Sequence, residues 1–204
     1  MKEWFLSLAD GFSQTFIEDG RWVLFAKGFG VTIRVAVLAL LMGIAIGILV
    51  AIVRTKHDTR KKNAHGVGNV ILNILNAICQ VYLTVIRGTP MMVQAMFIYY
   101  GSAYLFNINM SMWFAAFFVV SINTGAYMAE TVRGGILSVD EGQTEAANAI
   151  GMTHVQTMIN VILPQALRNI MPQIGNNLII NIKDTCVLSI IGIVELFYTT
   201  KGVA

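Results

Sequence analysis

The sequence predicts an all-α protein that crosses a membrane several times. Of its 204 residues, 56% are apolar and only 12% are charged, and the mean hydropathy is +0.67. Soluble domains have about 25% charged residues. Residues 88–129 contain no charge, and as one helix these 42 residues would measure roughly 63 Å, about twice the thickness of a bilayer core. The stretch must therefore fold back as a helical hairpin, and the composition argues against a soluble enzyme.

A first membrane span is predicted over residues 30–53. Its only charge, Arg34, lies near one end, where a long side chain reaches the head groups. Gly43 and Gly47 stand four residues apart, a spacing that lets a second helix approach closely. In a glycine-rich span the same spacing also arises by chance, so both interpretations stay open.

Basic residues after this span predict its orientation. Five of them, opposed only by Asp58, fall within nine residues: Arg54, Lys56, Arg60, Lys61 and Lys62. Such a cluster can bind nucleic acid. Between two apolar segments it is more typical of a cytoplasmic loop, because basic residues accumulate on the cytoplasmic side of membrane proteins. We therefore expect a lipid bilayer and no nucleic acid as partner.

The second span is predicted over residues 77–100. The apolar stretch 66–100 is too long for one upright span of about 20 residues, so its first part should lie along the membrane surface. Pro90 has no N–H to donate to the Ile86 carbonyl, which predicts a kink beside Arg87.

An uncharged external turn is predicted over residues 101–111. The third span, residues 112–131, would return the chain to the cytoplasm, where Glu130 and Arg133 mark its inner end. A fourth span is predicted over residues 172–196, with two charges near its middle.

These two charges are Lys183 and Asp184. Charges at that depth cost about 2.5–3.5 kcal/mol each even on the lower scales, so they usually pair or face water. One interpretation is a structural link to Arg87 or Glu130. The other is contact with the charged groups of a zwitterionic substrate.

Several polar side chains interrupt the apolar spans. They would suit a path for a molecule with ammonium and carboxylate groups, or they form hydrogen bonds between helices, and the sequence favours neither. With the charged residues, the candidates for such a path are Arg87, Thr89, Gln94, Asn123, Thr124, Tyr127, Glu130, Lys183 and Asp184. We expect no metal site, because His57, His65 and His154 have no second ligand at a recognisable spacing.

Residues 133–171 change to short amphipathic helices. Ser138 and Glu141 have the spacing of a capping box, and Gly151 is a natural stop. These signals predict a helix over residues 139–150.

A second capping box, Thr153 with Gln156, opens the following helix. Its apolar residues form one stripe before Pro164: Val155, Met158, Ile159 and Ile162. On the first helix Ala146, Ala147 and Ala149 are small, which suits the close approach of a partner surface. The alternative is a solvated helix whose alanines only favour helicity.

The spacing in this loop matches a family motif. Glu145-Ala146-Ala147, then Gly151 after three residues, then Val161 and Leu163-Pro164 resemble the EAA loop in the membrane subunits of bacterial ATP-binding cassette (ABC) importers. In that family the loop docks into the ATP-hydrolysing subunit. The resemblance thus implies a coupling role for Glu145, Ala146, Ala147, Gly151, Leu163 and Pro164.

Three other stretches resemble the polar-amino-acid permeases, the group that includes histidine and glutamine uptake systems. They are residues 85–90 with Gln94, residues 123–130 and residues 182–185, and the resemblance covers about residues 34–196. It implies a type I importer in the bacterial cytoplasmic membrane. The implied partners are a second permease, identical or homologous, a cytoplasmic ATPase dimer and an external amino-acid-binding protein.

Members of that family usually continue into a fifth span, so we expect about four of the usual spans here. We expect residues 1–204 to form a single transmembrane domain, with residues 133–171 as its cytoplasmic coupling loop.

No Walker A pattern occurs. ATP and Mg should therefore bind the partner ATPase, and this chain should hold no cofactor and be no enzyme. The alternative is an ion-coupled secondary amino-acid carrier. Such carriers often contain inverted internal repeats, and no such repeat is detectable in this sequence.

Overall fold

The computed structural model describes residues 2–59 and 67–203, and within these ranges the chain is helical without a strand. The α-helices are α1 (Lys2–Phe12), α2 (Trp22–Asp58), α3 (Val67–Gly88), α4 (Met91–Met96), α5 (Ser102–Phe106), α6 (Met112–Leu137), α7 (Glu141–Ala149), α8 (His154–Thr157), α9 (Leu163–Asp184) and α10 (Leu196–Val203). Short π and 3₁₀ segments connect several of them: Ser13–Ile17, Glu18–Gly20, Phe97–Gly101, Met158–Ile162 and Thr185–Ile191. Part of the predicted cytoplasmic loop lies outside the described residues, including three of its basic residues: Arg60, Lys61 and Lys62.

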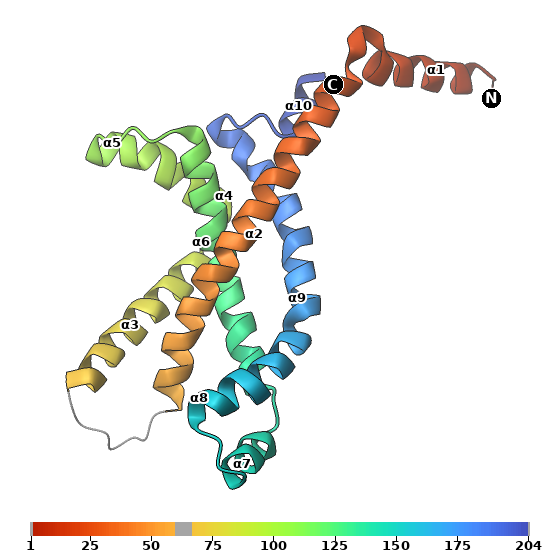
Figure 1. Ribbon diagram of the computed structural model, residues 1–204. Coiled ribbons are helices and arrows are strands. Elements are labelled where there is room, and N and C mark those ends of the chain that lie inside the picture. The colour runs from red at the N-terminus through yellow and green to blue at the C-terminus, as the bar shows by residue number, and fades with distance from the viewer. Residues whose placement is uncertain (1, 60–66, 204) are drawn as a thin grey trace.

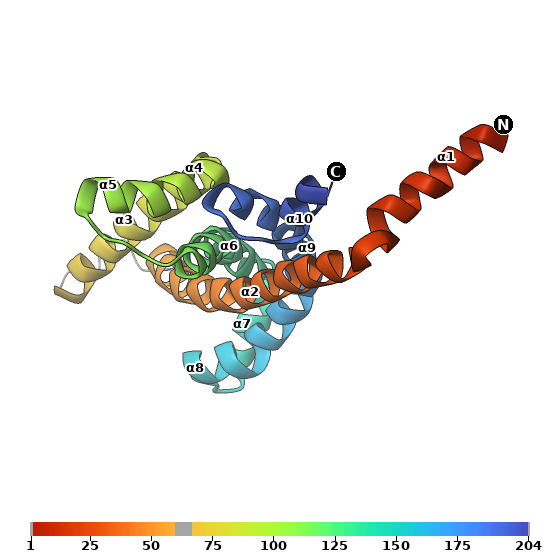
Figure 2. The same cartoon turned by 90° about the horizontal axis from the view of Figure 1, so that it is seen from above.

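Among the described residues, three helices are long and apolar enough to cross a membrane. These are α2, α3 and α6, and a fourth span results if residues 154–191 and α10, which meet at 60°, are counted together. Helix α2 runs the length of the bundle beside α6 and α9, and α7 and α8 lie at the end where α2 finishes (Figure 1). Helix α1 points away from the bundle in both views (Figure 2). The predicted all-α, multi-span architecture is confirmed.

The contact between α2 and α6 depends on two glycines. A Cβ atom at Gly43 would lie 2.6 Å from Thr124 Cγ2, and one at Gly47 would lie 2.6 Å from Met128 Cβ. Gly43 and Gly47 are both buried. The close-packing interpretation of this pair is therefore confirmed, and α6 is the helix that approaches.

We expect Gly47→Ala to lower the stability of the protein in detergent by about 1–3 kcal/mol, because its methyl group would overlap the α6 backbone. Gly30→Ala is the matched control on the same helix, since no atom lies within 4 Å of its Cβ position. A thermal unfolding midpoint for each variant tests this. Equal midpoints for the two variants would contradict the packing argument.

The second predicted span differs from the structure at its start and agrees at its kink. No boundary occurs at residue 77, because α3 is one continuous helix that begins at Val67. The helix breaks at Thr89–Pro90, and Pro90 adopts the extended conformation (ψ 137°) before α4. Proline removes one backbone donor there, so the predicted kink is present as a full break.

The external turn is shorter than predicted. Residues 101–106 are helical, and the irregular segment begins at Asn107, whose φ of 57° ends α5 in the left-handed conformation. Ser111 then caps α6 by accepting a hydrogen bond from the Phe114 N–H at 3.2 Å. Because Asn tolerates this conformation, it ends the helix here in place of glycine.

The predicted fourth span, residues 172–196, begins inside a helix and not at a helix start. Pro172 lies inside α9, which begins at Leu163 and carries Pro164 in its first turn. A proline in the first turn removes only a donor that would be unpaired anyway. Lys183 and Asp184 lie at the C-terminal end of α9, where the 3₁₀ segment Thr185–Ile191 follows directly.

Candidate functional site

The first candidate site is the pair α7 and α8 at one end of the bundle. The predicted capping box of Ser138 and Glu141 was wrong, because α6 continues to Leu137 and Ser138 instead donates its hydroxyl to the Gly135 carbonyl. Asp140 caps α7, and its Oδ1 accepts from the Gly142 N–H at 2.7 Å. Helix α7 therefore starts two residues later than predicted.

Gly151 ends α7 as predicted. Its φ is +85°, and the Met152 N–H donates to the Ala147 carbonyl while the Gly151 N–H donates to the Asn148 carbonyl, both at 3.0 Å. This is the Schellman pattern, which needs a residue in the left-handed conformation. The second predicted capping box, Thr153 with Gln156, is present in full.

The small residues of α7 divide between two faces. Ala147 is only 3% exposed, and it is packed within this chain. Glu145, Ala146 and Ala149 are exposed.

Beside them, large apolar side chains are open to a partner: Ile150 is 79% exposed, Val155 63% and Ile159 57%. Pro164 is exposed and Leu163 half-buried at the start of α9. The predicted coupling residues are thus close in sequence and in space, but Ala147 belongs to the inner face.

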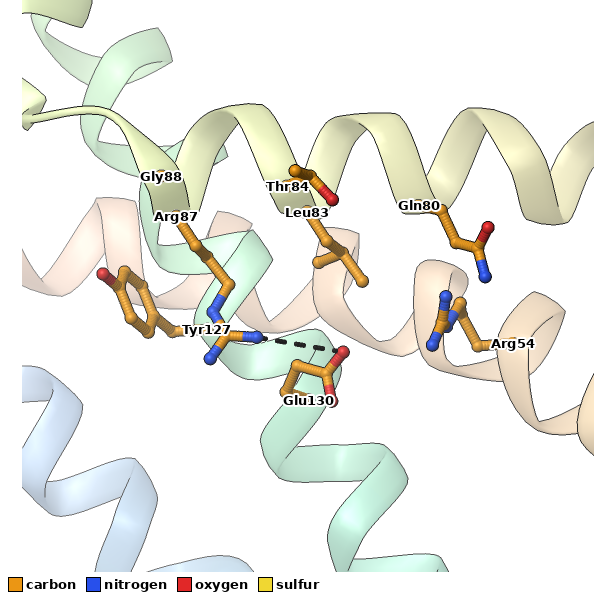
Figure 3. A pocket seen from close by; sticks show the side chains of 8 residues that line it. All are labelled: Arg54, Gln80, Leu83, Thr84, Arg87, Gly88, Tyr127 and Glu130. Carbon is orange, nitrogen blue, oxygen red and sulfur yellow. Dashed lines mark ion pairs between the residues drawn. The ribbon is translucent and has the colours of Figure 1, made fainter.

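The second candidate site is a pocket of about 580 Å³ between α2, α3 and α6. Figure 3 shows the side chains around it: Arg54, Gln80, Leu83, Thr84, Arg87, Gly88, Tyr127 and Glu130. Three of the predicted path residues, Arg87, Tyr127 and Glu130, meet here. Gln80 and Thr84 were missed, although their four-residue spacing places two polar groups on one side of an apolar helix.

Charged side chains connect three helices at this pocket. Arg87 on α3 lies 3.9 Å from Glu130 on α6, and its guanidinium lies 5.5 Å from the centre of the Tyr127 ring. Glu130 also pairs with Arg133 at 3.6 Å, and Arg133 with Asp58 at the end of α2 at 3.0 Å. The series Arg87–Glu130–Arg133–Asp58 therefore runs from the pocket to the end of the bundle that carries α7 and α8.

A buried amide holds the break between α3 and α4. The Gln94 Nε2 donates to the Ile86 carbonyl at 2.8 Å and to the Thr89 carbonyl at 3.0 Å. The Asn123 amide of α6 in turn donates to Gln94 Oε1 at 3.2 Å. Gln94 thus supplies the donor that Pro90 lacks, and its role in a substrate path stays a prediction.

The remaining path candidates lie apart from the pocket. Thr124 donates to Asn181 of α9 at 3.0 Å, and both side chains are buried. Lys183 is exposed and Asp184 half-buried, and within the described residues neither forms an ion pair. The link predicted from them to Arg87 or Glu130 is absent there, because Arg87 and Glu130 pair with each other.

These features define a class of protein. Several membrane-crossing helices enclose polar and charged groups, and a capped pair of helices stands exposed at one end, as in a membrane transport permease with a docking surface. Residues 66–201 match the family described as the inner membrane component of binding-protein-dependent transport systems, and the chain belongs to this family.

Curated relatives agree with this family. The chain is 39% identical over 174 residues to the glutamine transport system permease protein GlnP of Escherichia coli (strain K12), which covers 85% of this chain and 73% of that protein. The putative glutamine transport system permease protein GlnP of Rickettsia prowazekii (strain Madrid E) is 35% identical over 170 residues, covering 83% and 72%.

Solved structures agree as well. A crystal structure of an amino acid ABC transporter with histidines has a TM-score of 0.73 at 35% identity, covering 86% of this chain and 75% of that one. Inward-facing MetNI methionine ABC transporter has a TM-score of 0.70 at 17% identity, covering 89% and 81%, which supports the fold alone. The resemblance to polar-amino-acid ABC permeases is confirmed, and nothing in these comparisons supports an ion-coupled carrier.

Proposed function

We propose that this chain is the membrane-spanning subunit of an importer that moves a polar amino acid across a bacterial inner membrane, driven by ATP hydrolysis on a separate subunit. Relatives named for glutamine transport and a structural neighbour named as an amino acid transporter support this substrate class. The proposed partners are a cytoplasmic ATPase dimer, a second permease, identical or homologous, and an extracytoplasmic amino-acid-binding protein. ATP and Mg would be held by the ATPase, with no cofactor on this chain.

One observation carries the coupling part of this proposal: α7, α8 and the segments beside them expose small and large apolar side chains at the end of the bundle. Exposure of large apolar side chains to water is unfavourable, and a docked protein would bury the three that lie here: Ile150, Val155 and Ile159. Residues 133–171 are therefore proposed as the coupling segment, with Glu145, Ala146, Gly151, Leu163 and Pro164 nearest the partner. Ala147 would support this surface from inside.

The proposed substrate path passes the pocket at Arg87, Tyr127 and Glu130. A zwitterionic amino acid offers one carboxylate and one ammonium group, and the Arg87–Glu130 pair offers a charge of each sign. At 3.9 Å this pair is loose for a hydrogen-bonded ion pair, so substrate groups would exchange with it at modest cost.

Uptake into proteoliposomes tests the function directly. We expect the permease, reconstituted with its ATPase and binding protein, to accumulate glutamine only when ATP is enclosed with the ATPase, and vanadate to abolish uptake. An ionophore alone should have no effect. Uptake that persists with vanadate and stops with the ionophore would overturn the proposal in favour of an ion-coupled carrier.

The proposed orientation is tested by labelling single cysteines in a Cys79→Ala, Cys186→Ala background. We expect Asn109→Cys, in the turn before α6, to react with a membrane-impermeant maleimide from outside intact cells. Ala149→Cys, at the exposed end of α7, should react only after the membrane is opened. Labelling of both positions in intact cells would contradict the orientation.

A further inference from the structure

The pocket contains polar groups that the ion pairs do not use. Within the described residues, Arg54, Gln80 and Thr84 form no side-chain hydrogen bond or ion pair, and the Nε atom of Arg54 is buried without a partner. Figure 3 shows Gln80 reaching from α3 toward Arg54 on α2. Donors that gather around a cavity between membrane spans need an acceptor, because lipid tails supply none.

The nearby carboxylate does not meet this need. Glu130 already contacts Arg87 and Arg133. The end of the pocket at Arg54 is therefore a positive site with additional neutral donors, and it fits a single anion. A zwitterionic amino acid fits this end less well, because its ammonium group would find no free carboxylate beside it.

The surroundings point to an amphiphile. On α3, Ile78, Val81 and Val85 are 60%, 63% and 52% exposed, and Leu83 lines the pocket itself. An anion held by Arg54 would thus lie beside an open apolar helix face along which acyl chains extend. Arg54 also lies within one turn of Lys56 near the end of α2, which the basic residues place at the cytoplasmic surface.

We propose that Arg54, Gln80 and Thr84 bind the phosphodiester of an anionic phospholipid of the inner leaflet, at the α2–α3 end of the pocket. Basic pockets between membrane helices on the cytoplasmic side suit such head groups. The guanidinium supplies paired donors to the phosphate oxygens, and the Gln80 amide and Thr84 hydroxyl supply neutral ones. This site goes beyond the proposed transport function, since it requires only the inward orientation of α2 and not a substrate.

Native mass spectrometry of the full-length permease in detergent tests the site, with phosphatidylglycerol or phosphatidylcholine as the probe. We expect wild type to retain phosphatidylglycerol in preference, and Arg54→Gln to weaken that binding about tenfold, as expected for the loss of a charge-assisted contact. Arg54→Lys should keep part of the preference. Arg34→Gln is the matched control, since Arg34 is an exposed arginine of the same helix outside the pocket.

Gln80→Leu keeps the test informative if Arg54→Gln proves unstable, because the exposed Gln80 side chain can change without altering the core. Gln80→Leu should weaken phosphatidylglycerol binding and leave the size-exclusion elution profile of the permease unchanged. Equal retention of the two lipids by wild type, or equal effects of Arg54→Gln and Arg34→Gln, would overturn the proposal. Displacement of phosphatidylglycerol by millimolar glutamine would also overturn it, by assigning the site to substrate. If the reconstituted wild-type permease took up no glutamine but retained phosphatidylglycerol as expected, the result would count against the proposed transport function and not against the lipid site.

Discussion

Ala146→Trp is expected to release the ATPase from the purified permease while leaving the permease folded. Ala146 is exposed on α7, so the indole would project into the space that a partner groove needs without touching the core of this chain. Blocking the centre of an interface typically costs 2 kcal/mol or more, which is about a 30-fold loss of affinity. Retained ATPase on affinity-purified permease and vanadate-sensitive uptake should fall together.

Two controls separate docking from folding. Asn109→Trp places the same bulk in the turn at the other end of α6, and it should leave ATPase retention unchanged. Ala147→Trp, by contrast, is a poor probe of docking, because Ala147 is 3% exposed and the new side chain would displace α7 itself. If Ala146→Trp retained the ATPase and normal uptake, α7 would be a solvated connector without a coupling role.

Substitutions at Gly151 give a second test of the proposed docking surface on α7 and α8. At a φ of +85°, a β-branched residue is strained, so Gly151→Val should distort the Schellman turn between α7 and α8, whereas Gly151→Asn should be tolerated. A larger loss of ATPase retention for valine than for asparagine would link turn geometry to docking. Equal retention would show that the turn contributes nothing to the interface.

In this region, local signals in the sequence predict the structure correctly. Gly151 and the Thr153–Gln156 box act within a few residues of their own position, and both occur as predicted. The start of α7 was misplaced because Ser138 and Asp140 are both good N-caps. The choice between them depended on how far α6 extends, and near that end α6 packs against α9, where Gly135 lies beside Ala166 and Ile170. Ala147 is buried by residues outside α7, so the sequence of α7 alone does not place it on the inner face.

In the membrane spans, too, the sequence predicts features with a local cause and does not predict contacts between residues far apart in the chain. The break at Pro90 follows from one missing donor, so the sequence predicts it. Pro172, by contrast, lies inside α9. A proline normally interrupts a helix, so the sequence predicts a boundary there. Pocket residues from α2, α3 and α6 come together only through the fold. The Gln94–Asn123 contact likewise joins positions 29 residues apart, so both roles of these amides had to stay open.

Gln94→Leu is expected to lower the stability of the protein strongly, because Gln94 is a buried hydrogen-bonding residue at a helix break. The leucine would fill a similar volume but leave the Ile86 carbonyl and the Asn123 amide without their partner at the break. An unsatisfied buried polar group costs about 1–3 kcal/mol, so two of them should lower stability by at least about 2 kcal/mol. Gln173→Leu, at an exposed glutamine of α9, is the matched control and should have little effect.

A double-mutant cycle with Asn123→Leu then isolates the contact between α4 and α6. Hydrogen bonds between membrane helices contribute about 0.6 kcal/mol on average and up to about 1.7 kcal/mol, and we expect a coupling toward the upper value because both side chains are buried. Unfolding in sodium dodecyl sulfate, followed by circular dichroism, supplies the four free energies. Additive losses would mean that Gln94 stabilises only its own helix break, and the network from Thr89 to α6 would then have no role in joining the two halves of the second span to the core.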